Sequence, residues 1–248
     1  HRLDRQWRQC RPGRLAVAGS AIDRGCSLSM AGTTSKASKA ARSRLEDRAH
    51  GDGKTRCTWA SGASVDLPYR RYHDEEWGVP VHEDRRLFEF IVLEGAQAGL
   101  SWRTVLGKRE AYRRAFHDFD IAKVAAMSDA RLEKLLGDPA LIRNRLKIFS
   151  ARNNARAAMQ IIDESGSLDA WLWSWVDGKP LLNHWRSQDE VPATSSISDA
   201  LSKALHKRGF RFVGSTIMYA FMQATGMVND HLSGCFRHPR NHGKATRA

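Results

Sequence analysis

The residues of this chain that are best suited to chemistry include one glutamate in an otherwise uncharged run. Glu94 lies in the middle of Ile91 to Trp102, beside two glycines and before Trp102. An ionised carboxylate is costly to bury unless a charge or a hydrogen-bond donor faces it. The stretch therefore favours a small-molecule pocket with an acid in its wall. A buried helix whose glutamate reaches the surface or caps a neighbouring helix explains the same residues.

Cysteine and histidine occur together at two distant places. Cys57 and His73 lie near residue 60, and His231 and Cys235 lie four residues apart near the end. Two thiolates and two imidazoles form a closed tetrahedral shell for Zn2+, so an ion held there is structural. Neither pair is specific by itself, because a lone cysteine is more often a small buried hydrophobic residue. The rival ligands are His82, His238 and His242.

The charge balance is strongly basic. The 248 residues include 40 lysines and arginines against 27 acidic residues, which gives a net charge of +13. Such a balance favours a polyanionic partner, and nucleic acid comes first. No apolar run reaches the roughly 18 residues of a membrane span. There is no secretory signal, and the four scattered cysteines do not form a disulfide framework. We therefore expect a cytoplasmic protein with no membrane contact.

Residues 1–54 differ from the rest of the chain. Arginine and lysine recur there among glycine, serine, alanine and threonine, and large apolar residues are few. Such a segment cannot bury enough surface to offset the entropy of ordering it. We expect a disordered basic tail that adds non-specific DNA affinity, followed by one domain over 55–248 whose last few residues are disordered. A start codon at Met30 would make part of this tail non-native.

The organised region is predicted to be all-α, because no convincing alternating strand is found. Residues 67–80 mix aromatic, basic and acidic residues without a clear period, which is typical of a loop. Asp84 is the expected cap of a helix that contains Glu94. Residues 142–162 form an amphipathic helix with an arginine- and lysine-rich face, and residues 179–196 an irregular connection. The other expected helix caps are Asp120, Ser128 and Ser167.

A helix, a short hairpin and a buried helix follow one another near the C-terminus. Ser198 is the expected cap of a helix that ends at Gly209, residues 210–214 form the hairpin, and residues 215–225 are apolar almost all round. The free backbone N–H groups of such a unit can hold a phosphate, with charge from Lys207, Arg208 and Arg211. Any helix pair in a bundle, however, also needs a short turn that contains glycine.

Several long motifs stand in one order between about Arg56 and Pro239. They are Arg-Cys-Thr-Trp at 56–59, Tyr-His-Asp-Glu-Glu-Trp-Gly-Val-Pro at 72–80, Leu-Glu-Gly-Ala-Gln-Ala-Gly-Leu-Ser-Trp at 93–102, residues 198–205, Arg-Gly-Phe-Arg-Phe-Val-Gly at 208–214, and Val-Asn-Asp-His at 228–231. Together they resemble the 3-methyladenine DNA glycosylase I (TAG) family of the helix-hairpin-helix superfamily. The resemblance covers the whole organised region and leaves out the basic tail.

The resemblance implies a role for each group of residues. It implies a helix-hairpin-helix glycosylase bundle in which a structural Zn2+, held by Cys57, His73, His231 and Cys235, joins the N- and C-terminal ends. It implies a base pocket lined by Glu94 and by the aromatic residues Trp59, Tyr69, Tyr72, Trp77 and Trp102. Its DNA contacts are a wedge loop at Gly99 and Leu100 and a hairpin that includes Gly209, Phe210, Arg211 and Gly214. Ala96 replaces a glutamine that is common in the family, which puts one side-chain contact in doubt but not the pocket itself.

The expected activity is the removal of 3-methyladenine from alkylated double-stranded DNA by a monomer, through hydrolysis and without strand cleavage. Glu94 is expected to recognise the cationic base and, as a lesser role, to assist catalysis, while Asp230 is the alternative catalytic acid. Two other readings remain open. A DNA-binding module without catalysis needs no buried acid, and a zinc-stabilised bundle that binds proteins predicts no salt-dependent binding to DNA.

Overall fold

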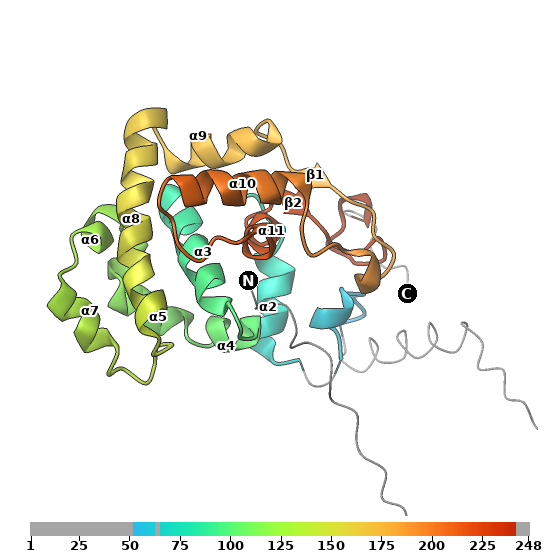
Figure 1. The fold of residues 1–248 in the computed structure, drawn as a ribbon. Helices are drawn as coiled ribbons and strands as arrows, with labels where there is room; N and C mark the ends of the chain where they lie inside the picture. The colour runs from blue at the N-terminus through green and yellow to red at the C-terminus, as the bar shows by residue number, and fades with distance from the viewer. Residues whose placement is uncertain (1–51, 63–64, 242–248) are drawn as a thin grey trace, which may run out of the picture.

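The computed structural model describes residues 52–62 and 65–241 (Figure 1). Most of the predicted basic tail, His242 and the C-terminal end therefore lie outside the described residues. The described part is helical, as predicted, with two strands of two residues each. Its α-helices are α2 (Leu67–Glu75), α3 (Asp84–Gln97), α4 (Trp102–Leu106), α5 (Arg109–Ala115), α6 (Ile121–Ala125), α7 (Asp129–Leu135), α8 (Arg145–Ser165), α9 (Leu168–Trp173), α10 (Ser196–Lys207) and α11 (Ser215–Ala224). None of the described helices combines the length and the apolar character that crossing a bilayer requires.

Helix α3 lies at the centre of the fold. Every residue from Leu87 to Ala96 is buried, and α4, α8, α9 and α11 all contact this helix. Two of its buried residues are acidic. Glu89 accepts hydrogen bonds from Arg109 and Arg113 at 2.7 and 2.8 Å and also pairs with Arg86. The fold therefore neutralises one of the two buried acids of α3 with three arginines, and Glu94 is the other.

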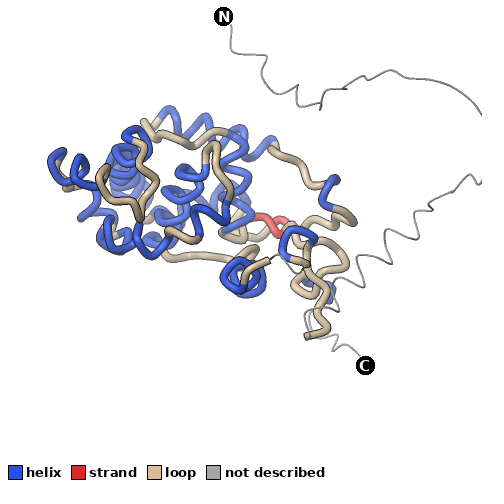
Figure 2. Tube along the Cα trace, turned by 90° about the horizontal axis from the view of Figure 1, so that it is seen from below, coloured by secondary structure: helices blue, strands red, loops and turns tan. Residues whose placement is uncertain are grey.

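The two short strands join distant parts of the chain. β1 (Leu181–Leu182) pairs in parallel with β2 (Val228–Asn229). Seen from below, the pair lies between a helix-rich part and a part made mostly of loops (Figure 2). In the loop-rich part the two ends of the described chain meet, because Phe236 N–H donates to the carbonyl of Thr55 at 2.8 Å. The expectation of a purely irregular connection over 179–196 is therefore wrong at β1.

Three of the predicted helix caps are confirmed. Asp120, Ser128 and Ser167 each accept a backbone N–H from the third residue after them, at 3.0, 3.2 and 2.9 Å. Two other caps were predicted wrongly. Helix α10 begins three residues early, with Ser195 as its cap, and Ser198 completes a reciprocal capping box. The Asp84 carboxylate accepts from the N–H groups of Leu168 and Asp169, so it caps α9 and not its own helix.

The segment 67–80 begins as a helix and not as the loop that its composition predicted. Asp66 caps α2 by accepting from Tyr69 N–H at 2.8 Å, and Pro68 lies in the first turn, where its missing N–H costs nothing. The helical period is hard to see because α2 buries only Tyr72 and His73 and leaves most of its other side chains partly or fully exposed. Its buried face carries site residues in place of a plain apolar stripe.

Gly226 allows the segment after α2 to lie directly against the end of α11. Its φ is +71°, and a Cβ added there would lie 2.4 Å from the carbonyl carbon of Val79 and 2.5 Å from Pro80 N. Hydrogen bonds from Gly78 N–H to Gln223 O and from Val81 N–H to Thr225 O, both 3.0 Å, hold the two segments together. Only glycine fits at this position, because any side chain would displace the backbone of Val79 and Pro80.

We expect the substitution Gly226→Ala to lower the free energy of unfolding by at least about 2 kcal/mol, because it adds left-handed strain to a backbone overlap. Denaturant unfolding followed by circular dichroism measures the loss. Gly137→Ala is the matched control, since its Cβ would meet only one carbonyl at an ordinary 3.5 Å. Equal stability of the two variants would contradict the close approach.

Candidate active site and metal centre

Glu94 lies in the last turn of α3 with only 3% of its surface exposed. Its carboxyl group makes no hydrogen bond or ion pair within the described residues, and burial raises its pKa to about 8. Burial also acts on Glu89, but its hydrogen bonds from Arg109 and Arg113 hold the pKa of that carboxyl below its ordinary value. Five residues apart on one helix, one acid is saturated by the fold and the other has no partner.

A cavity of about 330 Å³ opens beside Glu94. One wall comes from the end of α3 and the loop after it, and the other comes from the first two turns of α11. The lining residues are Glu94, Gln97, Ala98, Gly99, Leu100, Thr216, Ile217 and Ala220. The volume suits a ligand of the size of a nucleobase or larger. Thr216, Ile217 and Ala220 had not been predicted as site residues, because the apolar pattern of α11 indicates core packing.

The five aromatic residues predicted for the base pocket form one connected cluster. Trp59 contacts Tyr69 and Trp77 edge-to-face, with ring centroids 5.3 and 5.1 Å apart, and Tyr72 lies 5.3 Å from Trp102. Trp59 also approaches Tyr72 at 6.5 Å, which links the two groups. None of the five lines the cavity described above. The structure therefore brings the predicted aromatic residues together but assigns the cavity wall to other residues.

Glu94 couples the cluster to the cavity. Burial comes first among the causes that raise the pKa of Tyr69 and Tyr72, and the negative charge of Glu94 adds to it for both hydroxyl groups. The indole Nε1 of Trp102 is buried and has no hydrogen-bond partner among the described residues. A buried donor without a partner is unusual in a native structure and is expected where a ligand supplies the acceptor.

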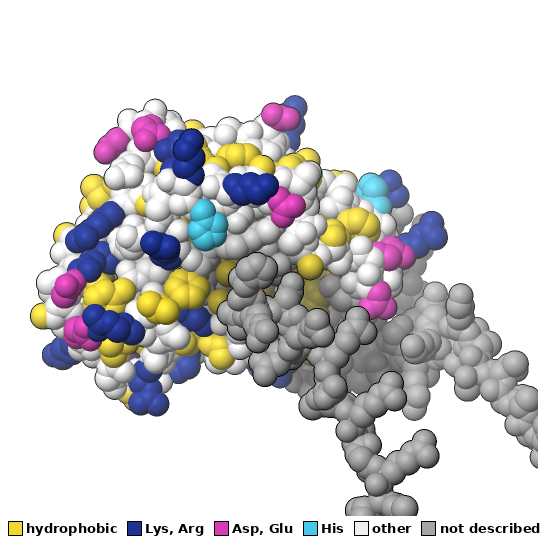
Figure 3. All heavy atoms as spheres, viewed as in Figure 1, with side chains coloured by type: hydrophobic (Ala, Val, Ile, Leu, Met, Phe, Trp, Pro, Cys, Tyr) yellow, Lys and Arg dark blue, Asp and Glu magenta, His cyan; other side chains and the backbone are white. Residues whose placement is uncertain are grey.

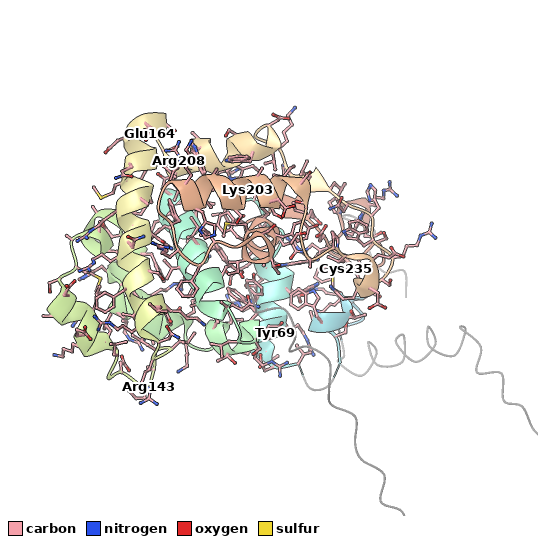
Figure 4. The ribbon with its side chains drawn as sticks, viewed as in Figure 1. Tyr69, Arg143, Glu164, Lys203, Arg208 and Cys235 are labelled. Carbon is pink, nitrogen blue, oxygen red and sulfur yellow. The ribbon has the colours of Figure 1, made fainter. Side chains whose placement is uncertain are left out.

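Cys57, His73, His231 and Cys235 come together as predicted. All four are buried, and their ligand atoms lie within 4.8 Å of one another. The Sγ–N distances are 3.6 Å from Cys57 to His231 Nδ1, 3.5 Å from Cys235 to His73 Nε2 and 3.6 Å from Cys235 to His231 Nδ1. Cys235 lies in the loop-rich part, close to the first described segment of the chain (Figure 4). Residues 231–235 form a loop with a turn at Ser233 and Gly234.

These distances fit a single tetrahedral metal ion. Bonds of about 2.3 Å to sulfur and about 2.05 Å to nitrogen at the tetrahedral angle place S and N about 3.5 to 3.6 Å apart. The histidines are also oriented for this role. His73 donates from Nδ1 to Asp74 at 2.8 Å, and His231 donates from Nε2 to the carbonyl of Trp77 at 3.0 Å. Each ring thus turns its free nitrogen lone pair toward the cluster.

The rival histidines are engaged elsewhere. His82 stacks on Trp173 with ring centroids 4.3 Å apart and pairs with Asp169 at 2.9 Å. His238 is fully buried, contacts His184 with 3.1 Å between ring nitrogens, and accepts the backbone N–H of Arg240 through Nδ1. His242 lies outside the described residues. The described alternatives therefore do not compete for the four-residue cluster.

Asp230 is buried, and both oxygens of its carboxylate accept hydrogen bonds from the protein. One carboxylate oxygen accepts from Asn183 Nδ2 and Trp185 Nε1 at 2.7 and 2.8 Å, and the other accepts from Tyr219 Oη and Gln223 Nε2 at 2.8 and 2.7 Å. Four donors saturate a carboxylate. Asp230 thus ties the segment after β1 to α11, and it does not line the cavity beside Glu94.

The predicted wedge loop connects α3 to α4. Gly99 has a φ of +75°, and Leu100 is 42% exposed although it is a large apolar residue. Lys147, from α8, donates its ammonium group to the carbonyls of Ala96 and Ala98 at 2.8 and 2.6 Å. The last carbonyls of α3 thereby gain a partner, and the loop is fixed in place. Sequence analysis did not assign this role to Lys147.

The hairpin between α10 and α11 is held by α8 and α3. Asn154 accepts from Arg211 N–H at 2.8 Å and donates to its carbonyl at 3.0 Å, while Asn153 donates to Gly209 O at 2.7 Å. Gly95 lets the hairpin approach α3, because a Cβ there would lie 3.1 Å from Phe212 Cβ. Gly214 caps α11 without a side-chain acceptor, so the first N–H groups of this helix remain available.

One side chain of the predicted DNA-contacting hairpin is buried, and one cation beside the hairpin is already paired. Phe210 is 1% exposed and its N–H donates to Leu205 O at 3.0 Å, so it packs in the core and offers no contact. Arg208, expected to supply charge, pairs with Glu164 at 2.6 Å and lies over the ring of Trp171. Arg211 is exposed, as a DNA contact requires. The apolar alternation of the hairpin hid the buried role of Phe210.

The chain matches a family model that is described as methyladenine glycosylase, over residues 59–238. It belongs to the methyladenine glycosylase family. DNA-3-methyladenine glycosylase 1 of Escherichia coli (strain K12) is 51% identical over 186 residues, which cover 75% of this chain and 98% of that protein. The resemblance drawn from the sequence motifs is confirmed.

Solved structures of methyladenine glycosylases have the same fold. A crystal structure of 3-methyladenine DNA glycosylase I (TAG) matches with a TM-score of 0.72 and 52% identity, covering 75% of this chain and 100% of that one. A variant of such an enzyme in complex with 3-methyladenine matches with a TM-score of 0.69 and 35% identity, covering 70% of this chain and 94% of that one.

The Asp74 carboxylate orients His73, one of the four residues that could hold a metal ion. It accepts from His73 and also from the buried Arg56, whose Nη2 lies 2.7 Å away. We expect Asp74→Asn to lower the affinity for a probe ion, Co2+, about 10- to 100-fold. The thiolate charge-transfer absorption of Co2+ reports binding. The control is Glu75→Gln, because the exposed Glu75 pairs only with the exposed Arg71. Unchanged affinity in the Asp74 variant would contradict this role.

Proposed function

We propose that this protein removes 3-methyladenine from double-stranded DNA by hydrolysing the N-glycosidic bond, which leaves an abasic site without strand cleavage. One observation carries the proposal: a buried carboxyl group without a protein partner, Glu94, lies between a cavity and an aromatic cluster. Membership of the methyladenine glycosylase family and 51% identity with a DNA-3-methyladenine glycosylase support the same activity.

A base inside a duplex cannot be reached, so the nucleotide must be rotated out of the stack. The exposed Leu100 can then fill the space that the base leaves, as apolar wedges do in other DNA-bending proteins. The aromatic cluster offers ring faces and edges for the displaced base. Insertion of Leu100 requires a loop with a fixed conformation. Lys147 fixes the loop of Gly99 and Leu100 by donating hydrogen bonds to the carbonyls of Ala96 and Ala98.

Methylation at N3 makes adenine in DNA cationic, and the departing base becomes neutral. Glu94 therefore interacts most strongly with the base that has to be selected, through charge and hydrogen bonding in a dry site. The aromatic cluster on the other side of Glu94 adds cation–π attraction for a base that reaches those rings. As bond cleavage begins, positive charge passes to the sugar, and a carboxylate stabilises that charge as well. Since the bond is already labile, recognition is the main role of Glu94.

The residues around the cavity support hydrolysis without strand cleavage. A lyase reaction needs an amine that attacks the sugar and forms a Schiff base. No lysine is among the lining residues of the cavity, and the ammonium group of Lys147 is bound to two backbone carbonyls. The four hydrogen bonds to Asp230 likewise speak for an anchoring role for that residue.

For the cysteine and histidine cluster we propose a structural Zn2+. The two thiols and two imidazoles are the ligands that zinc prefers, and they leave no open position for substrate. Cys57 comes from the first described segment, and His231 and Cys235 come from the last. Bound zinc would stabilise the junction of these segments, next to Trp59 and Trp77, whose rings lie 5.0 Å from His73 and 4.7 Å from His231. Its effect on the pocket is thus one of positioning.

For α10, the loop after it and α11 we propose a helix-hairpin-helix unit that holds a DNA phosphate. The N–H groups at the start of α11 have no side-chain cap, and they form the positive end of the helix dipole. Gly209, with a φ of +89°, and Gly214 let the backbone turn there, and the exposed Arg211 adds charge. Such contacts fix the position of DNA but do not read its sequence.

A DNA-binding module without catalysis explains the basic surface and the hairpin but not Glu94. A buried acid without a partner costs stability, and a simple binder gains nothing from it. A bundle that binds proteins leaves the uncapped helix and the buried indole N–H of Trp102 without a purpose. Excision of the base accounts for all of these features.

We expect Glu94→Gln to lower kcat/KM for the release of 3-methyladenine from methylated DNA at least about tenfold, or about 1.4 kcal/mol of transition-state stabilisation. The amide keeps the shape of the side chain but loses its charge. Chromatography of the released bases measures the rate.

The matched control is Glu83→Gln, the same change at the exposed start of the same helix. It should release the base at the wild-type rate. A Glu94 variant as active as wild type would remove Glu94 from the mechanism. Absence of release by the folded, metal-loaded wild type would overturn the proposed activity.

A further inference from the structure

The first turn of α8 presents an apolar side chain to solvent among basic residues. Leu146 is 71% exposed. Figure 3 shows hydrophobic and basic side chains together at the lower end of α8, on the face that also carries α10 and the hairpin. Arg143 projects from the loop just before this helix (Figure 4). Leu146 therefore contributes little to the core, and its neighbours in sequence include the cations Arg143, Arg145 and Lys147.

The fold uses the other cations along α8 internally. Arg145 pairs with Glu133 and lies over the ring of Phe149, while Arg152 pairs with Asp129 at 2.6 Å and Arg156 donates to Ala125 O at 3.0 Å. Lys147 is bound to the end of α3. Arg143, in contrast, makes no hydrogen bond or ion pair with any described residue. Its guanidinium group is free to bind an anion.

This surface continues the wedge loop. Lys147 follows Leu146 directly in the first turn of α8. Its ammonium group donates to the carbonyl of Ala98, which precedes Leu100 by two residues in the chain. Farther along the same helix, Asn153 and Asn154 hold the hairpin. With a rise of 1.5 Å per residue, Lys147 and Asn154 lie about 10 Å apart along the axis. Helix α8 thus supports both proposed DNA contacts. Leu146 lies in its first turn, beside the Lys147 that holds the wedge loop, and Arg143 lies in the loop just before the helix.

We propose that Arg143 and Leu146 form an additional DNA contact beside the wedge loop, in which Arg143 binds a backbone phosphate and Leu146 packs against the sugars next to the lesion. The inference rests on the proposed function, because the occupant is the duplex opened at the damaged base. A free guanidinium group matches the charge of a phosphate. The apolar Leu146 side chain, with cations on both sides in the sequence, can pack against the sugars of a DNA strand that the wedge loop has opened.

The test measures the binding of a fluorescent duplex with one abasic tetrahydrofuran site by anisotropy at several salt concentrations. Arg143→Gln should weaken binding about three- to tenfold at low salt and reduce the slope of log K against log salt by about one, as expected for one lost phosphate contact. Leu146→Ser should weaken binding to the same duplex with the slope unchanged. Circular dichroism confirms that both variants are folded.

The matched control is Lys179→Gln, which removes the same charge from the exposed segment between α9 and β1, far from the first turn of α8 (Figure 1). It should leave the slope as in the wild type. An unchanged salt slope in Arg143→Gln would overturn the inference, and so would an equal fall of the slope in Arg143→Gln and Lys179→Gln. If the wild type releases no 3-methyladenine but Arg143→Gln still loses slope, the proposed function fails while the DNA contact stands.

Discussion

The burial of the Glu94 carboxyl group without a partner is the constraint on which the site depends. The fold provides three arginines for Glu89 on the same helix and none for Glu94. Because burial raises the pKa of Glu94 to about 8, the folded protein retains a proton that the unfolded chain releases above pH 4.5. Stability from this group therefore falls as the pH rises from about 4.5 to about 8. Under the proposed function, a cationic base in the cavity would supply the missing charge and favour the carboxylate.

The rest of the structure keeps this carboxyl group in place and dry. Helix α3 packs against α8, α9 and α11. Tyr69 and Tyr72 of the aromatic cluster lie near enough to Glu94 for its charge to raise their pKa values. The cysteine and histidine cluster packs against the opposite end of the aromatic cluster, where the ring of Trp77 lies 4.7 Å from that of His231. Helix α8 fixes the wedge loop through Lys147 and the hairpin through Asn154. The proposed base site and the proposed DNA contacts are thereby connected through α3 and α8.

Much of this could be predicted from the sequence, and the limits have physical causes. Glu94 stood out because a charge in an apolar run is unusual, and its burial is confirmed. The cluster of cysteine and histidine residues was predicted from residue type. The hydrogen bond by which Asp74 orients His73 could not be predicted, because it depends on how the two side chains are placed in the fold. Helix α2 was missed because its buried face carries site residues and no apolar stripe. The burial of the Phe210 side chain was not predicted, because a buried and an exposed aromatic residue look alike in a turn bounded by glycines, and Lys147 looks like any surface lysine of α8.

The most direct test of this account is the ionisation of Glu94 in the free protein. Carbon-13 NMR of glutamate-labelled protein, with Glu94→Gln to assign the signal, gives its pKa. The account predicts a titration near pH 8 that moves to lower pH when a duplex with a cationic purine analogue is bound, because the bound charge favours the carboxylate. A titration near the ordinary value of 4.5 would show that solvent or a donor satisfies the carboxyl group, and would contradict the central claim.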